Sequence, residues 1–334
     1  MSVSYKSSNY AVSRVKILEG KLLDKDRINR MIEAQSAKEA YRILQESGYG
    51  AAVEAGEPRD FECLIEHELT ELGKFVEEVS VDPELTDVLL MRTDYKNAKA
   101  YLKMRMMSVD VEEAVSEAGK VPTQELREMV FQMDTYGLPQ DLAEAISEAD
   151  RQIAIDPNPS KIDNIIDKHY TGWAAKTAKK KNNEFLEELF VSWADMNNIL
   201  SLLRVREMKA DVNFLKDALL DGGEISHEAI LDAYTLNDDM LPLKFKNSRY
   251  GHELLNAIER ALELKKAWNF EHYIENMFIK IAKKQKLKVF GIDPLLGYII
   301  GKQAEATAVR MVMTGKINKM RADDIRERLR DLYV

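Results

Sequence analysis

A pattern of charged and apolar residues that occurs three times most constrains how this chain can fold. The segments 91–107 and 192–208 read MRTDYKNAKAYLKMRMM and SWADMNNILSLLRVREM. The copies share an acidic residue followed by a basic residue, and the first two also share an asparagine, as follows: Asp94, Asn97 and Arg105; Asp195, Asn198 and Arg206; Glu305 and Lys316. An apolar residue eight positions after the acid recurs in all three copies. Such repetition is typical of chains that stack one kind of unit and present surfaces to other molecules.

The spacing of the acid and the base limits what these two side chains can contact. They are eleven residues apart in each copy, which is about three turns of helix, so both lie on nearly the same helix face roughly 16 Å apart. They cannot pair with each other at that separation. Two interpretations stay open: packing and capping contacts within each unit, or equivalent polar groups that line a central funnel and are available to a partner.

The spacing of apolar residues is helical along almost the whole chain. Apolar residues recur every three or four positions through predicted long helices near 60–80, 160–180 and 252–284. The eight prolines fall between such segments, where a residue that cannot continue a helix marks a start or a break. Sustained alternation of apolar and polar residues, which would indicate strands, is absent. The sequence predicts an all-α protein.

The three copies predict three pseudo-equivalent helical repeat domains. We place them at residues 1–115, 116–210 and 211–334, with boundaries where glycine and acidic residues gather. Each domain is expected to contain a short helical hairpin, a long helix, a polar joint and a closing helix that carries the acid and the base. The end of the chain, Met320–Val334, is predicted to be an amphipathic helix that caps the third domain.

Residue types that support catalysis or metal binding are present but are not arranged for either. The five histidines are scattered, without the spacing of a helical metal site, and neither a phosphate-binding loop nor a GxSxG motif occurs. Cys63 is the only cysteine, which rules out an internal disulfide framework and fits a reducing compartment. We therefore expect no enzyme activity, no cofactor, no metal and no small-molecule substrate.

The charge and the hydropathy exclude two further classes of protein. The 334 residues carry a net charge of −9, which disfavours general binding to nucleic acid because phosphate contacts need concentrated lysine and arginine. No apolar run approaches the ~20 residues of a spanning helix, so any association with a membrane is expected to be indirect.

Two basic runs stand out from the acidic background. Their lysines are Lys176, Lys179, Lys180 and Lys181 in the first run and Lys280, Lys283, Lys284, Lys286 and Lys288 in the second. One interpretation is a solvated helix end, where cations complement the C-terminal dipole. The other is a docking surface for acidic loops of a partner or for lipid headgroups.

Four stretches of the chain carry a family likeness. The segments 9–32 (NYAVSRVKILEGKLLDKDRINRMI) and 41–50 (YRILQESGYG) resemble the start of the C subunit of V-type and archaeal-type rotary ATPases, which is called the d subunit in eukaryotic vacuolar enzymes. The segment 93–105 (TDYKNAKAYLKMR) resembles the D-x-x-N-x-K element of that family, and 290–334 is similar to its C-terminus. Ala308 departs from the pattern, because it stands where a third asparagine would fall.

The resemblance implies a definite role. Members of this family are all-helical funnels of three similar domains that lie between the central stalk and the membrane rotor ring. The implied function is a non-catalytic rotor subunit, in an enzyme that couples proton or sodium transport to ATP hydrolysis or synthesis. The implied partners are central-stalk subunits of the D and F types and the ring of proteolipid subunits. The chain would be one copy in a hetero-oligomeric complex, peripheral on the cytoplasmic face of the membrane.

Two other classes of function stay open on the residues alone. A free-standing α-helical scaffold or adaptor would share the repeats but would have no affinity for a rotor. An enzyme with a site assembled by the fold would need clustered titratable groups with shifted pKa values.

Overall fold

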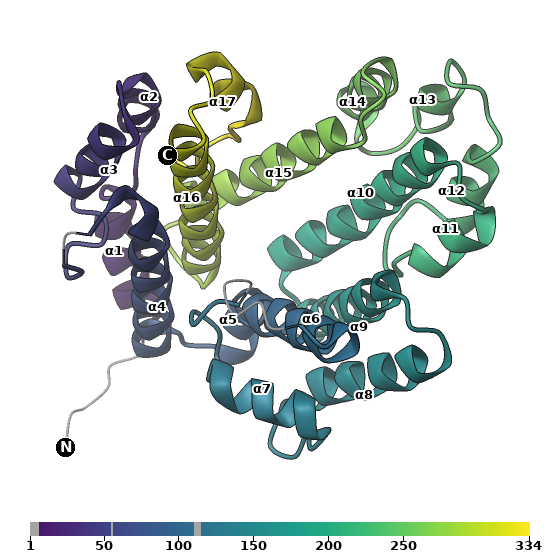
Figure 1. The fold of residues 1–334 in the computed structure, drawn as a ribbon, viewed down its shortest axis with the longest axis horizontal. Helices are drawn as coiled ribbons and strands as arrows, with labels where there is room; N and C mark the ends of the chain where they lie inside the picture. The colour runs from purple at the N-terminus through teal and green to yellow at the C-terminus, as the bar shows by residue number, and fades with distance from the viewer. Residues whose placement is uncertain (1–6, 55, 110–114) are drawn as a thin grey trace. The chain divides into compact units, whose positions relative to one another are not determined.

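The computed structural model describes residues 7–54, 56–109 and 115–334, and these residues form helices with no strand among them (Figure 1). The predicted all-α class is confirmed. The chain divides into two compact units: unit 1 comprises Met1–Asn97, Val111–Leu126 and Phe278–Val334, and unit 2 comprises Ala98–Asp110 and Arg127–Met277. The predicted boundary at 115 adjoins residues 110–114, which lie outside the described residues. The division into three repeats stays a prediction.

The helices of unit 1 come from both ends of the chain. They are α1 (Ser8–Glu19), α2 (Lys25–Glu33), α3 (Ala37–Glu46), η1 (Pro58–Asp60), α4 (Phe61–Val79), α5 (Pro83–Leu90), η3 (Lys284–Leu287), α16 (Asp293–Ile317) and α17 (Ala322–Arg328). Three helices run from one unit into the other: α6 (Arg92–Met107), α7 (Thr123–Gln132) and α15 (Trp268–Lys283).

The helices of unit 2 come from the middle of the chain. They are α8 (Gln140–Ile155), α9 (Pro159–Lys180), α10 (Glu184–Met208), α11 (Val212–Ala218), α12 (His227–Ala233), α13 (Leu241–Lys244) and α14 (Gly251–Glu263). Several helices in both units begin where the side chain of a short polar residue accepts a hydrogen bond from the exposed N–H groups of the first turn, which is the usual reason for a helix to start there. These N-cap residues are Ser7, Asp24, Ser36, Asn158, Asn183, Asp211 and Ser226.

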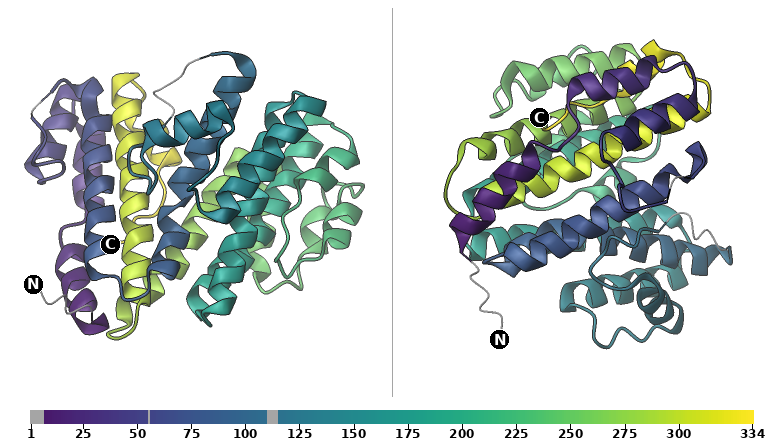
Figure 2. Two further views of the ribbon diagram at one scale, coloured as in Figure 1. Left: turned by 90° about the horizontal axis from the view of Figure 1, so that it is seen from below. Right: turned by 90° about the vertical axis from the view of Figure 1, so that its left-hand side faces the viewer.

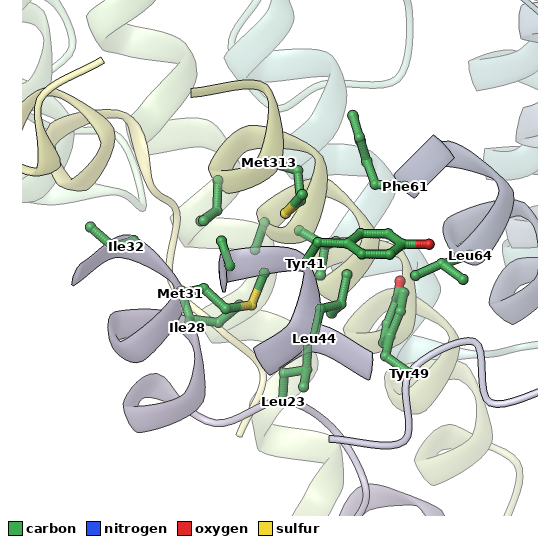
Figure 3. Packing of buried hydrophobic residues seen from close by; sticks show 14 of the residues in the cluster. Leu23, Ile28, Met31, Ile32, Tyr41, Leu44, Tyr49, Phe61, Leu64 and Met313 are labelled. Carbon is green, nitrogen blue, oxygen red and sulfur yellow. The ribbon is translucent and has the colours of Figure 1, made fainter. Parts of the chain in front are cut away.

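Helix α16 is the centre of unit 1. It packs against α1, α2, α3, α4 and α5, and Figure 2 shows it lying beside α4 in both views. Apolar residues of α2, α3, α4 and α16 meet in one cluster, in which Met31, Leu44 and Met313 are fully buried (Figure 3). A 25-residue helix covered on several sides explains why α16 has no clear polar face.

The core of unit 2 is built on α8, α9 and α10, which pack in sequence order. Tyr170 of α9 meets Phe190 of α10 edge to face, with ring centroids 6.0 Å apart, a favourable arrangement for two aromatic rings. Helices α9 and α15 lie where long helices were predicted near 160–180 and within 252–284.

The predicted helix at 252–284 is wrong in its continuity, because α14 and α15 divide it. The chain turns at Leu264–Ala267, where Lys265 adopts a left-handed conformation with φ of 49°. The carboxylate of Glu207 then accepts the N–H of Ala267, at 3.0 Å, next to the start of α15. The N–H next to this helix start is thus paired with a residue 60 positions away, and a local pattern of apolar residues could not predict the break.

The predicted C-terminal helix is also shorter than expected. Helix α17 ends at Arg328, and the last residues are not helical. Tyr333 is buried, lies against Gly301 of α16, and donates its hydroxyl to Glu19 of α1 at 3.0 Å. The tyrosine reaches this position because the chain leaves the helix. An amphipathic helix would bury Ile325, Leu329 and Leu332 along one stripe. Ile325 and Leu332 are buried and Leu329 is half-buried, but only Ile325 lies on the helix.

Candidate functional site

The repeated acidic residues share one contact. In each copy the buried carboxylate accepts the backbone N–H of a residue that lies two positions before the start of another helix. The pairs are Asp94 with Val121 before α7 (2.9 Å), Asp195 with Ile225 before α12 (2.8 Å), and Glu305 with Leu23 before α2 (2.6 Å). A negative charge near the first turn complements the positive end of a helix dipole. The acid therefore fixes where the second helix begins.

The basic residue eleven positions later contacts the other end of that second helix in two copies. Arg206 donates to the carbonyl oxygens of Ala233 and Tyr234 at the end of α12, at 3.2 and 2.8 Å. Lys316 donates to the carbonyl oxygen of Ala34, just after α2, at 2.8 Å. A cation satisfies carbonyl groups that a helix end leaves unpaired. We call each acid with its base a helix clamp: Asp94/Arg105, Asp195/Arg206 and Glu305/Lys316.

The first helix clamp differs at its basic end. Arg105 of α6 pairs with the carboxylate of Asp150 in α8, instead of with carbonyl groups at the end of α7. At its acidic end Asp94 accepts a second backbone N–H, from Lys120, at 3.0 Å. The clamp thus has two anchors at the start of α7 and an ion pair with the following helix.

The third helix clamp is closed by the beginning of the chain. Helices α7 and α12 come after α6 and α10 in the sequence, whereas the helix clamped by α16 comes long before it. Helix α2 takes that place, although Leu23 and Glu305 are 282 residues apart. The other oxygen of Glu305 binds the ammonium group of Lys302, which also pairs with Glu68 at 2.7 Å. The N-terminal and C-terminal parts of unit 1 therefore depend on each other.

The repeated asparagines make the same pair of hydrogen bonds in the first two copies. The Asn97 amide binds both the N–H and the C=O of Ser116, at 3.0 and 2.8 Å. The Asn198 amide does the same with Leu220, at 2.7 and 2.9 Å. Both asparagines are buried, so they satisfy backbone groups of a connecting segment that no regular element satisfies. Ala308 of the third copy is buried among apolar residues instead.

Two glycines near the helix clamps were not predicted to matter from the sequence. A Cβ atom at Gly119 would overlap a carboxylate oxygen of Asp94, and one at Gly223 would overlap a carboxylate oxygen of Asp195. Each glycine stands two residues before the N–H that its carboxylate binds. Aligning GKVP (119–122) with GEIS (223–226) could have found this pattern, since a glycine, a charged residue and an aliphatic residue recur there.

Burial changes the titration of the clamp carboxylates. Desolvation raises the pKa of Asp94 and of Asp195, and the hydrogen bonds from backbone N–H groups oppose this shift in both. For Asp195 the hydroxyl of Tyr250, which donates at 2.7 Å, also opposes it. Desolvation likewise raises the pKa of Glu305, against the attraction of Lys302. These contacts favour the interpretation in which the repeated charges make packing and capping contacts between helices. That they line a central funnel stays a prediction.

The two basic runs lie at the ends of long helices. Lys176, Lys179 and Lys180 are exposed on the last turns of α9, and Lys181 caps it. The second run begins on α15 and continues through η3; in it Lys280, Lys284 and Lys288 are exposed and Lys283 and Lys286 are half-buried. Lys288 pairs with Asp293 at 2.5 Å. Whether either run docks a partner stays a prediction.

Two negative findings concern the residues that the structure describes. Among them, no three histidine, cysteine or acidic side chains come together as they would to hold a metal ion. Over the same part of the chain, none of the helices combines the length and the apolar character that crossing a membrane requires.

Comparison with known proteins identifies relatives along nearly the full length. Residues 11–328 match the model of the family described as ATP synthase (C/AC39) subunit. The chain is 22% identical over 317 residues to the C subunit of the V-type sodium ATPase of Enterococcus hirae, covering 94% of this chain and 95% of the relative. It is 23% identical over 344 residues to the C subunit of the A-type ATP synthase of Methanocaldococcus jannaschii, covering 96% and 85%. A third relative, the C subunit of the A-type ATP synthase of Halorubrum lacusprofundi, is 23% identical, with 98% and 99% covered.

The family match and the curated relatives agree with the resemblance seen in the sequence. The match includes all three helix clamps, from Asp94 to Lys316, and the helix α2 that closes the third one. The chain therefore belongs to the ATP synthase (C/AC39) subunit family.

Proposed function

We propose that this chain is a non-catalytic rotor subunit of a V/A-type ATPase, which couples the central stalk to the membrane ring of proteolipid subunits. Family membership supports the proposal, since its relatives are named as subunits of a V-type sodium ATPase and of A-type ATP synthases. The observation that carries the mechanical part is the recurrence of the helix clamp on α6, α10 and α16.

A subunit that transmits torque must resist bending of one helix against the next. Apolar packing alone supplies much of this resistance, because close-packed interiors have low compressibility. A helix clamp adds directional bonds. Arg206 and Asp195, for example, hold the end and the approach of α12 from one helix, α10. Sliding of α12 along α10 would break bonds at both ends together.

The partners of the chain would be those that the resemblance implied. Central-stalk subunits of the D and F types would bind one side of the chain and the proteolipid ring the other, at the cytoplasmic face of the membrane. The clamp charges would then serve internal support.

The experiment that tests this proposal separates coupling from catalysis. The intact ATPase complex that contains this chain is stripped of it, and ATP hydrolysis and ATP-driven ion transport into vesicles are measured before and after the purified full chain is added back. We expect hydrolysis by the catalytic head to persist without the chain, and transport to be lost and then restored. Size-exclusion chromatography should show a stoichiometric complex of the chain with the D- and F-type subunits.

Transport that continues at full rate without the chain would refute the coupling role. A folded helical chain that binds neither the stalk subunits nor the solubilised ring would favour the scaffold alternative. Loss of hydrolysis on removal, with no recovery on adding the chain back, would contradict a non-catalytic coupling role.

A further inference from the structure

The connector between α15 and α16 exposes large apolar side chains at close spacing. Leu287, Val289 and Phe290 have 86%, 59% and 70% of their surfaces exposed. Three large apolar residues within four positions are costly to leave in water, and exposed patches of this kind mark interaction sites more often than single exposed residues do.

The connector is also strongly basic. Between residues 280 and 293 the chain has five lysines and one carboxylate, Asp293. The pKa of Lys283 is lowered, mainly by burial; the charge of Asp331 opposes the shift, while the charges of Lys25 and Lys286 add to it. Lys25 therefore adds a positive charge close to the lysines of the connector.

Contacts with both ends of the chain hold the connector in place. Lys16 of α1 donates to the backbone carbonyl of Lys286 at 2.5 Å. The ammonium group of Lys286 lies 5.3 Å from the ring centroid of Tyr333, which is itself buried. The exposed side chains thus lie next to Lys286, which is held through its backbone carbonyl and through its ammonium group.

We propose that residues 284–290 form a membrane-contact loop that inserts Leu287 and Phe290 among the headgroups of an anionic lipid surface. Apolar side chains flanked by lysine suit such a surface, because the apolar groups enter the boundary of the acyl chains while the lysines meet lipid phosphates. Long lysine side chains can keep their charge at the headgroups while their stems lie along apolar surface.

A lipid surface fits this loop better than an acidic protein partner does. Stable protein interfaces bury roughly 800 Å² on each partner with matched shapes, whereas the exposed apolar residues here belong to one short connector. Insertion into lipid needs no matched shape. It also uses the apolar side chains and the lysines together, whereas an acidic protein loop would complement only the positive charge of the lysines.

The first basic run provides an internal comparison. Lys176 and Lys179 lie at the end of α9, which is followed by the polar residues Asn182 and Asn183. No large apolar residue between positions 156 and 207, all of which the structure describes, is prominently exposed. These lysines complement the C-terminal end of a helix dipole and lack the apolar component of a membrane-contact loop.

Vesicle flotation with the purified full chain tests the proposal. Binding is compared between vesicles of phosphatidylcholine mixed with phosphatidylglycerol and vesicles of phosphatidylcholine alone. L287S/F290S removes the apolar component, and Y136S/I155S is its matched control, since Tyr136 and Ile155 are 90% and 78% exposed on unit 2. K280Q/K284Q removes two charges from the basic run, and K176Q/K179Q is the matched control on α9. Circular dichroism verifies the fold of each variant.

We expect the wild-type chain to float with the anionic vesicles and not with the neutral ones. L287S/F290S should weaken this binding about tenfold or more. K280Q/K284Q should weaken it several-fold and reduce its salt dependence. Both control variants should bind as the wild type does.

Equal binding by L287S/F290S and the wild type would overturn the proposal, as would equal loss in the control variants or equal binding to neutral vesicles. If the wild-type chain does not float, yet L287S/F290S loses capture by the solubilised proteolipid ring, the loop contacts protein and the lipid proposal is wrong. Because the vesicles contain no ATPase subunit, this result stands apart from the test of the coupling role.

Discussion

The second helix clamp predicts that Asp195 stabilises unit 2 through the hydrogen bonds it accepts. Replacing Asp195 with alanine leaves the N–H of Ile225 and the hydroxyl of Tyr250 without this acceptor. Each unsatisfied donor costs about 1–3 kcal/mol when buried, and both donor residues are partly buried, so the expected loss is about 2–4 kcal/mol. Replacing Asp195 with asparagine keeps one oxygen for Ile225, and the hydroxyl of Tyr250 can rotate to accept from the amide. That loss should stay below about 1 kcal/mol.

Tryptophan fluorescence gives a selective assay for this prediction. All three tryptophans, Trp173, Trp193 and Trp268, belong to unit 2. Urea unfolding followed by their emission therefore reports on the unit that contains the substitution. A shift of the midpoint at constant slope measures the change in stability.

Asp239→Ala is the matched control, because Asp239 is exposed on the same unit. A substitution of this kind is expected to change stability by less than about 0.5 kcal/mol. If Asp195→Ala costs no more than this control, the helix clamp does not stabilise the unit. If Asp195→Asn costs as much as Asp195→Ala, the charge matters more than the accepted hydrogen bonds, and the reasoning fails.

Three further predictions follow from the same contacts. Burial raises the pKa of Asp195 above its ordinary value of about 3.9, so ionisation of this carboxyl disfavours folding increasingly as pH rises above about 4. The stability advantage of the wild type over Asp195→Asn should therefore widen as urea titrations move from neutral pH towards about pH 4. A difference in stability that narrows over this range would contradict the prediction. Gly223→Ala should destabilise unit 2 by about 1–3 kcal/mol, because its methyl group would overlap Asp195; an unchanged midpoint would show that the connecting segment yields freely. Glu305→Ala should increase amide exchange at Leu23 and through α2 while leaving tryptophan unfolding unchanged, since it removes the acceptor of the Leu23 N–H; unaltered exchange would mean that the third helix clamp is not needed to hold α2.

The sequence predicted the helices better than it predicted their joints. The spacing of apolar residues located α4 and α9 closely, because one face of each helix is buried. The break between α14 and α15 depends on Glu207, which belongs to another helix. The irregular end of the chain depends on Tyr333 meeting Gly301 and Glu19. A contact that joins distant positions leaves no trace in the local pattern.

The candidate site shows the same limit. The repeat marked the acid and the base, and the eleven-residue spacing showed that they could not pair. It could not identify Leu23 as the partner of Glu305, because that contact joins opposite ends of the chain. Nor did it reveal that the bases of the second and third copies bind carbonyl groups, because backbone acceptors have no signature in a sequence.

The closure of the third helix clamp by α2 has a consequence for how the chain is made. Helix α2 is made long before α16, since Glu305 and Lys316 are added 282 residues after the residues on either side of α2 that they bind. At ordinary rates of synthesis the delay is roughly fifteen seconds to a minute. During that time the apolar side chains of Ile28, Met31 and Ile32 lack the cover of α16. Unit 2, which comes from the middle of the chain, can fold during this delay. Unit 1 stays incomplete, with apolar side chains of α2 exposed to chaperones.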